Sequence, residues 1–506
     1  MIELAERNGR GGAEMSENYN EIIAALLKRV SVLERELAET RKLLAEKDAV
    51  IAAQSARIKE LEERLGKNSQ NSSKPPSSDG YRKARPVSNR EKTGRKAGAQ
   101  AGHHGHGLKM PKPDVIEDVA HLPEGCAGCP HFGTCPKVAT SSVRNEIDVE
   151  IKTVLKRHYT ESYACAKEAG KVVSGSFPEG IQSSMQYGAG VKALAATLNT
   201  EGMMSVARVH DFLSSALNLP VCTGTVSAIV KELAFRLGGT VQAIVRALMA
   251  SPVNNADETG FRVEGFLYWL HSVCNADFTY LAVQKKRGEE GMRAIGFLPE
   301  YQGVVVSDCL GAYWKFDNLS HAICNAHILR ELKGIHESDP KQTWAEDMRS
   351  LLREMAHARN EAVRADAPAL PPETVRAFRT RYVAILEQAA GKNPLPVRQP
   401  GQRGRLARGP VRCLIDRLTA HRDEALLFLE DFRVPFTNNR AEQSLRMAKV
   451  KGKVSGCMRT LSGADDFAAI MSFIGSVKKH GINVLSAVKD AFLGNAYGVL
   501  FPAPTE

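Results

Sequence analysis

The sequence has no apolar run of the roughly 18 residues that a membrane-spanning helix needs. Residues 1–20 are polar and acidic, which excludes a secretory signal peptide. Only 10 of the 506 residues are cysteines, and they are too unevenly spread for a disulfide scaffold. We therefore expect no membrane partner and a location in the reducing cytoplasm.

What the sequence does contain is an excess of positive charge. The net charge is +11 and the pI is near 9.1, which favours a polyanionic partner, with nucleic acid first. An unspecialised basic protein would have the same bulk charge. The positions of the charged residues must therefore distinguish it from a nucleic-acid-binding protein. The hydrophobic share of 43% is ordinary, and the length predicts several domains.

Residues 18–66 are predicted to form a coiled coil, because apolar residues recur there at every seventh position. The repeating positions are Ile23, Val30, Leu37, Leu44, Ile51, Ile58 and Leu65. A coiled coil would make the protein a homo-oligomer. The alternative is a single amphipathic helix packed on the body of the protein.

Residues 67–112 are predicted to be a disordered basic linker, since they are too polar to bury a core.

Residues 113–175 are predicted to form a cysteine-rich domain that resembles a zinc ribbon. Its candidate zinc ligands are Cys126, Cys129, Cys135 and Cys165. The first two stand in a Cys-x-x-Cys arrangement that presents two thiolates to one Zn²⁺. A small loop-rich domain with free thiols is the alternative.

Residues 185–250 are predicted to be helical. An apolar stripe runs through 205–217, a proline-containing break follows at 219–221, and Thr223 or Thr225 is available to cap a second helix. Two short helices around a tight break resemble a DNA-binding helix-turn-helix, although any helical hairpin gives a similar pattern.

Residues 251–330 carry the most informative pattern. Three β-rich runs are followed by a helical stretch at 288–298 and then by the short apolar run 304–306, which is typical of a buried strand. This is the order of a ribonuclease-H-like α/β core, and the fold class that we expect for the whole chain is multidomain α+β. This order brings Asp257, on the first strand, next to Asp308, at the end of the fourth.

Two neighbouring carboxylates repel each other unless divalent cations lie between them. Two cations, held by hard oxygen ligands, promote the cleavage and joining of phosphodiesters, and Mg²⁺ or Mn²⁺ suits this role. The third carboxylate expected for such a site is Glu442. It also matches a helix capping box that begins at Asn439, so a purely structural role is an equal alternative. Candidate DNA contacts surround it, namely Arg440, Arg446, Lys449, Lys451 and Lys453.

About 130 residues separate Asp308 from Glu442, too many for a loop. Helical patterns predict an inserted α-helical domain at 331–430, with the second part of the core at 431–500. Cys324-x-x-His327 precedes the insertion. We interpret it as a buried polar pair at a helix start rather than as a metal site, because two further ligands are not visible.

Several motifs together resemble the DDE transposases of the insertion-sequence-sixty-six family. The motifs are Asp257-Glu258-Thr259-Gly260, Ser307-Asp308 with Tyr313, Cys324-x-x-His327, and Asn438-Asn439-x-Ala441-Glu442 with Arg446. The resemblance extends to the heptads, the linker, the cysteine region and 456–481, and so covers nearly the whole chain.

This resemblance implies metal-dependent DNA strand cleavage and strand transfer at insertion-sequence ends, with Asp257, Asp308 and Glu442 as metal ligands. It also implies a bacterial, nucleoid-associated protein, with element-encoded helper proteins as further partners. Many relatives have an acid where this chain has Thr437, and the second cysteine pair of the family is reduced here to Cys165. Two other functions remain open: a non-catalytic DNA-binding regulator, and a structure-specific nuclease with the same core.

Overall fold

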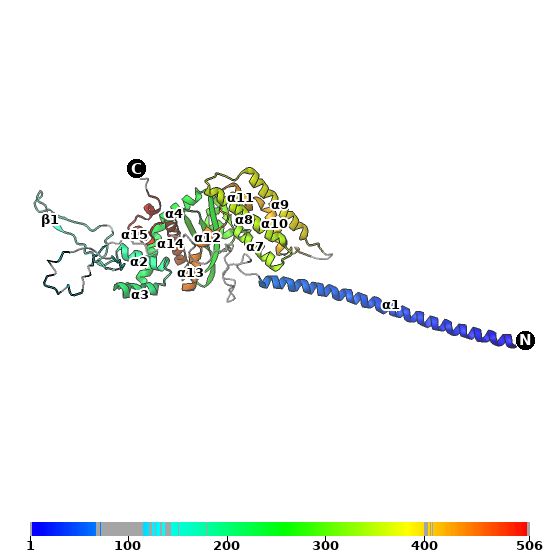
Figure 1. Cartoon of the computed structure of the whole chain (residues 1–506). Helices are drawn as coiled ribbons and strands as arrows, with labels where there is room; N and C mark the ends of the chain where they lie inside the picture. Colours follow the sequence, from blue (N-terminus) through cyan, green and yellow to red (C-terminus); the bar gives the residue numbers. More distant parts are fainter. Residues whose placement is uncertain are drawn as a thin grey trace.

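The structure is a computed structural model of the whole chain (Figure 1). It describes residues 3–66, 71, 115–119, 121, 124–126, 128–131, 134–136, 143–149, 151–178, 180–398, 403–404, 406 and 408–502. The predicted linker 67–112 lies outside these residues except for Asn71. None of the helices in the described ranges is both long and apolar enough to span a membrane.

The N-terminal segment is one helix, α1 (Glu3–Gly66), which projects from the body in Figure 1. Its described side chains, from residue 22 onward, are exposed, including the heptad residues Leu37 and Leu44. The alternative of a helix packed on the body is therefore wrong for this part of α1. Pairing with a second chain stays a prediction.

The described parts of the cysteine region have little regular structure. A short hairpin joins β1 (Ser162–Ala164) to β2 (Val172–Ser174), and Cys165 begins the turn between them. All six strand residues are exposed. This region therefore adds nothing to the apolar core in its described residues.

A helical layer follows, made of α2 (Ala189–Thr200), α3 (Val206–Leu217) and α4 (Thr223–Met249). The predicted break is present, because Asn218 ends α3 in the left-handed conformation. The predicted threonine cap of α4 is wrong. Cys222 occupies the N-cap position, and no side chain closes a cap hydrogen bond there.

The central sheet has five strands in the order β5-β4-β3-β6-β7. They are β3 (Val253–Val263), β4 (Phe266–Cys274), β5 (Thr279–Gln284), β6 (Val304–Ser307) and β7 (Ser320–Ile323). The first three are antiparallel neighbours, and β6 runs parallel to β3 and to β7. The β3–β4 turn uses Glu264 and Gly265, both with positive φ, as the sequence predicts.

One face of the sheet is covered by α5 (Glu289–Ile295), α6 (Phe297–Glu300) and the short 3₁₀ helix η3 (Tyr313–Lys315). The single helix predicted for 288–298 is divided at Gly296, whose φ of 82° ends α5. These elements pack against Ala256 of β3, Val273 of β4 and Tyr280 of β5.

The other face is covered by α12 (Asn439–Ser444), α13 (Arg446–Ser455) and α14 (Leu461–Lys479). Ser472 and Ser476 of α14 accept hydrogen bonds from backbone amides of β5, at 2.9 and 3.0 Å. Two C-terminal helices, α15 (Val484–Phe492) and α16 (Ala496–Leu500), pack on α2 and α4.

Between β7 and α12 the chain forms a helical insertion with its own apolar core around the fully buried Trp344. It contains α7 (Asn325–Ser338), α8 (Thr343–Arg364), α9 (Pro372–Lys392), α10 (Gly409–Ala420) and α11 (Arg422–Glu430). Its core continues onto β6 and β7 through Val306, Ala322 and Ile323. The insertion is thus packed directly on the edge of the sheet.

Candidate active site

Asp257 lies in the middle of β3, on the face that α12 and α14 cover. Its partner on β4 is Ser272, which hydrogen-bonds Ser444 of α12 at 2.6 Å. The strand begins six residues earlier than the predicted run at Thr259, so Asp257 is held within the sheet rather than before it. This is a rigid position for a functional carboxylate.

Asp308 directly follows β6, which pairs in parallel with β3. The last paired residues are Asn255 and Val306, and Asp257 and Asp308 each stand two residues further along. Because side chains alternate along strands, the two aspartates extend to the same face, on strands about 4.8 Å apart. The Leu310 amide donates to Asp308 Oδ1 at 2.9 Å and orients the carboxylate.

Glu442 comes from α12, and Asn438 determines where that helix starts. The buried Asn438 side chain accepts from Asn255 Nδ2 at 2.9 Å and donates to the Ala256 carbonyl at 2.7 Å. Its backbone amide donates to Cys324 Sγ at 3.1 Å. Asn438 therefore joins α12 to β3, immediately before Asp257, and to the start of α7.

The capping-box alternative for Glu442 is not realised. The N-cap residue of α12 is Asn438, whose side chain makes no cap hydrogen bond and whose amide is used by Cys324. Glu442 Oε1 is buried and, within the described residues, has no hydrogen-bond partner. A buried oxygen of this kind is costly unless a ligand or a charge compensates it.

The electrostatics show that the acids share one region. Burial raises the pKa of Asp257 well above its usual value, and the charges of Glu258, Asp308 and Glu442 raise it further. Burial also raises the pKa of Asp308, while the Leu310 amide, Arg287 and Arg417 oppose the shift. Mutually repelling acids of this kind favour a bound cation.

The closest charged neighbours of Glu442 lie on α7. Arg330 Nη2 is 3.6 Å and His327 Nδ1 is 3.9 Å from Glu442 Oε1. Burial, together with the charges of Arg330 and Arg417, lowers the pKa of His327 to about 4, so the imidazole is neutral near pH 7. Arg330 is thus the full positive charge next to Glu442.

Across the described ranges, one set of three metal-capable ligand atoms lies within 4.8 Å of one another, and it comprises Cys324, His327 and Glu442. The three acids Asp257, Asp308 and Glu442 are neighbours but do not form such a compact set. The predicted buried polar pair, Cys324 and His327, is therefore next to the third acid, which sequence reasoning did not anticipate.

Glu258 lies on the opposite face of β3 and has a different environment. Its fully buried side chain accepts from Arg287 Nε at 2.9 Å and from the Tyr313 hydroxyl at 2.8 Å. Arg287 also lies over the Trp269 ring, 5.0 Å from its centroid. In the sequence, Glu258 and Tyr313 stand out only as parts of two motifs. No sequence pattern predicts the hydrogen bond between them.

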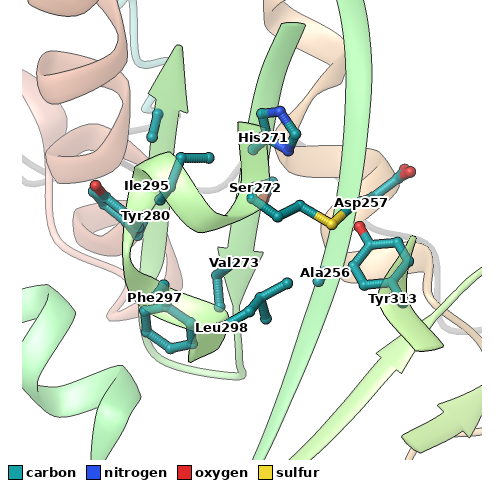
Figure 2. A pocket seen from close by; sticks show the side chains of 12 residues that line it. Ala256, Asp257, His271, Ser272, Val273, Tyr280, Ile295, Phe297, Leu298 and Tyr313 are labelled. Atoms are coloured by element: carbon teal, nitrogen blue, oxygen red, sulfur yellow. The ribbon is translucent and has the colours of Figure 1, made fainter. Parts of the chain in front are cut away.

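A small cavity of about 20 Å³ lies on the Glu258 side of the sheet, between β3, β4, β5 and the helices α5 and α6. Figure 2 shows apolar side chains around it, including Val273, Phe297 and Leu298, while the Asp257 side chain points away. The cavity has room for about one water molecule and not for a nucleotide. The acids face the other side of the sheet.

The candidate DNA contacts differ in their surroundings. Arg440, Arg446, Lys449 and Lys453 are exposed on α12 and α13. Lys451 is partly buried and donates to the Asn199 carbonyl of α2 at 3.3 Å, and burial lowers its pKa. Lys451 therefore has a structural partner, whereas the other four are open to a ligand.

The candidate zinc ligands are not gathered. The only compact three-ligand set found in the described part of the chain does not include Cys126, Cys129, Cys135 or Cys165. Cys129 and Cys126 are joined by a backbone hydrogen bond of 3.2 Å, which forms the expected tight turn. Zinc binding in this region stays a prediction.

Comparison with known proteins places this arrangement in a class. A family model described as "Transposase IS66 family" matches residues 184–466, more than half of the chain. A second model, "Family of unknown function (DUF6444)", matches residues 23–109. The chain is also 26% identical over 181 residues to "Uncharacterized protein y4jO" of Sinorhizobium fredii (strain NBRC 101917 / NGR234), covering 36% of this chain and 49% of that protein.

The matched residues include all three acids, the Asn438 junction and the helical insertion. The class of protein that this match defines is that of the transposases. The protein belongs to the IS66 family of transposases.

Proposed function

We propose that this protein cleaves DNA strands at the ends of an insertion sequence and transfers them to target DNA, as a DDE enzyme. One observation carries the proposal. Asp257 and Asp308 stand in register on adjacent parallel strands, and Asn438 secures the helix that brings Glu442 to the same face.

A ribonuclease-H-like core supports this chemistry. The strand order β5-β4-β3-β6-β7, with three antiparallel strands followed by parallel ones, agrees with the order expected for that fold. We assign β3 to β7 with α12 and α14 to the core, and α7 to α11 to an insertion between the second and third acids.

The three carboxylates are suited to hold Mg²⁺ or Mn²⁺. They offer hard oxygen ligands, two of them have raised pKa values, and Glu442 Oε1 is buried with no hydrogen-bond donor among the described residues. When bound, two such cations would activate a water or a 3′-hydroxyl and stabilise the leaving oxygen.

The remaining parts of the chain would bind and organise DNA. The exposed Arg440, Arg446, Lys449 and Lys453 lie on the helices that carry or follow Glu442, and are positioned to neutralise phosphates beside the site. The α3–α4 pair is a candidate for reading the terminal repeats. Pairing of α1 would bring two element ends together, and helper proteins and structural zinc belong to the same proposal.

The test is a strand-transfer assay with the full chain, labelled terminal-repeat DNA and Mg²⁺. Asp257→Asn, Asp308→Asn and Glu442→Gln should each abolish nicking and joining. Asp277→Asn, which alters an exposed turn carboxylate, is the matched control and should keep both. Unchanged activity in any of the three variants would remove that residue from the site. Cleavage without joining would indicate a nuclease, and DNA binding without either reaction would indicate a regulator.

A further inference from the structure

Glu442 has charged neighbours of both signs. Toward the sheet it contributes to the repulsion that raises the pKa of Asp257. Toward the insertion its Oε1 atom faces Arg330 and His327 of α7 at 3.6 and 3.9 Å. The carboxylate therefore lies between an acidic group and a basic one.

A change of partner at Glu442 would be made by its side chain, since the start of α12 is fixed. Asn438 ties the start of the helix to β3 and, through Cys324, to α7. The glutamate side chain has three rotatable bonds, so rotation of the side chain alone can redirect the carboxylate. Its side chain is 34% exposed, which leaves space for that rotation.

Arg330 is built to hold the carboxylate on the α7 side. Its side chain is only 18% exposed, and its Nε donates to the Ala326 carbonyl at 3.3 Å within the same helix. A second arginine, Arg417 of α10, adds positive charge near His327 and is itself paired with Glu331. Because Arg417 has Glu331 as its partner, Arg330 is the arginine that makes the α7 side attractive to the Glu442 carboxylate and unfavourable for a cation.

We propose that Arg330 is a positioning residue that holds the Glu442 carboxylate against α7 in the metal-free protein and releases it to the aspartates when a divalent cation binds. The proposal rests on the proposed function, because it requires Asp257 and Asp308 to bind the cation. Through Arg330, the insertion would then influence the cation concentration at which Glu442 joins the two aspartates as a ligand.

The consequence is measurable as cation affinity. If only a fraction of the molecules has the conformation that binds the cation, the apparent dissociation constant is the intrinsic one divided by that fraction. Removing Arg330 should leave Glu442 available and remove a repelling charge, so cation affinity should rise by about fivefold to tenfold.

The experiment is titration of the chelator-treated full chain with Mn²⁺, followed by the resonance signal of free Mn²⁺. Arg330→Gln is compared with Lys333→Gln, which removes a positive charge from the same helix at a residue paired with Glu337. The double variant Arg330→Gln/Glu442→Gln shows whether the effect passes through Glu442. We expect tighter binding in Arg330→Gln alone, and no effect of that change once Glu442 is neutral.

Three results would overturn this role of Arg330. The first is an equal gain in Lys333→Gln, which would indicate general charge rather than a specific pair. The second is a gain that persists in the Glu442→Gln background. The third is a Co²⁺–thiolate absorption band that Cys324→Ser removes and Cys126→Ser does not, which would make the cluster of Cys324, His327 and Glu442 a transition-metal site.

Two further variants keep the outcome interpretable. Arg330→Lys retains the positive charge and should bind Mn²⁺ much as the wild type does, even if Arg330→Gln folds poorly. Asp257→Asn separates the two proposals. If it binds Mn²⁺ as well as the wild type, the proposed function fails; if it loses Mn²⁺ while Arg330→Gln is unchanged, only the role of Arg330 fails.

Discussion

Asp257 and Glu258 are consecutive residues of β3, yet they face opposite sides of the sheet and have opposite surroundings. Glu258 is fully buried but accepts hydrogen bonds from the Arg287 guanidinium and the Tyr313 hydroxyl. Asp257 has further acids as neighbours, and within the described residues no cationic side chain lies within 4.0 Å of it. Burial therefore does not determine the use of a carboxylate. The partners on one face satisfy Glu258 within the protein, and the other face gives Asp257 no cationic partner among the described residues.

The largest expected difference is in catalysis. Asp257→Asn should reduce strand cleavage by at least about a thousandfold, because a metal ligand contributes several kcal/mol to such a reaction. Glu258→Gln should reduce it far less, provided that the variant is folded. Rates from single-turnover cleavage of end-labelled DNA compare the two. Equal losses would break the distinction between the two faces.

The stabilities should change in the reverse order. Glu258→Gln leaves one acceptor oxygen where Arg287 and Tyr313 each bond one, so a hydrogen bond is lost and the free energy of unfolding should fall by about 2 kcal/mol. This is less than for a fully buried pair, since the Arg287 side chain is 44% exposed. Urea unfolding of the metal-free chain measures it. A stability equal to that of the wild type would mean that this ion pair contributes nothing.

A smaller loss is expected at the second partner of Glu258. Tyr313→Phe deletes only the hydroxyl that donates to Glu258 Oε2 at 2.8 Å. A hydrogen bond to a charged acceptor contributes about 1.5 kcal/mol, so the loss should be of that size. Tyr280→Phe, on β5 of the same sheet, is a matched control and should lose less.

The smallest and most specific difference concerns pH. The folded-state pKa of Asp257 is raised, so the folded protein binds more protons than the unfolded chain between the two values. The free energy of unfolding should therefore fall as pH rises through that window. Glu258 contributes in the same direction, because burial and Asp308 raise its pKa, although Tyr313 and Arg287 oppose this shift.

The corresponding measurement is thermal unfolding with a chelator between pH 5 and pH 9. Asp257→Asn should flatten the profile more than Glu258→Gln and should be more stable than the wild type at the alkaline end. Added Mg²⁺ should restore the wild type there and leave Asp257→Asn unchanged. A profile of Asp257→Asn that is as steep as that of the wild type would contradict the raised pKa.

Much of the sheet was predictable from local pattern. The runs around 259–263, 266–273 and 278–283, the turn at Glu264 and Gly265, and the buried run 304–306 all correspond to observed strands or turns. Asp257 and Asp308 followed from that order. The helix α1 and its exposed heptad residues were also predictable, since the period of a helix depends on nearby residues alone.

What could not be predicted depends on contacts between distant residues. Asn438 bonds to Asn255 and Ala256, more than 180 positions away, and no local pattern encodes that pairing. The capping box at Asn439 was a reasonable interpretation that failed because Asn438 occupies the N-cap position, which leaves Glu442 one residue too far along the helix. Lys451 was grouped with its basic neighbours, but α2 lies close enough to bind it.

The helical insertion also has a consequence for the timing of synthesis. Asp308 and Glu442 are 134 positions apart in the sequence, and α7 to α11 lie between them. At about 5–20 residues per second, a ribosome needs roughly ten seconds to make that interval. During this time a nascent chain exposes two of its acids without the third. An unfinished polypeptide therefore carries an incomplete set of acids, and the whole insertion must be translated before the set is complete.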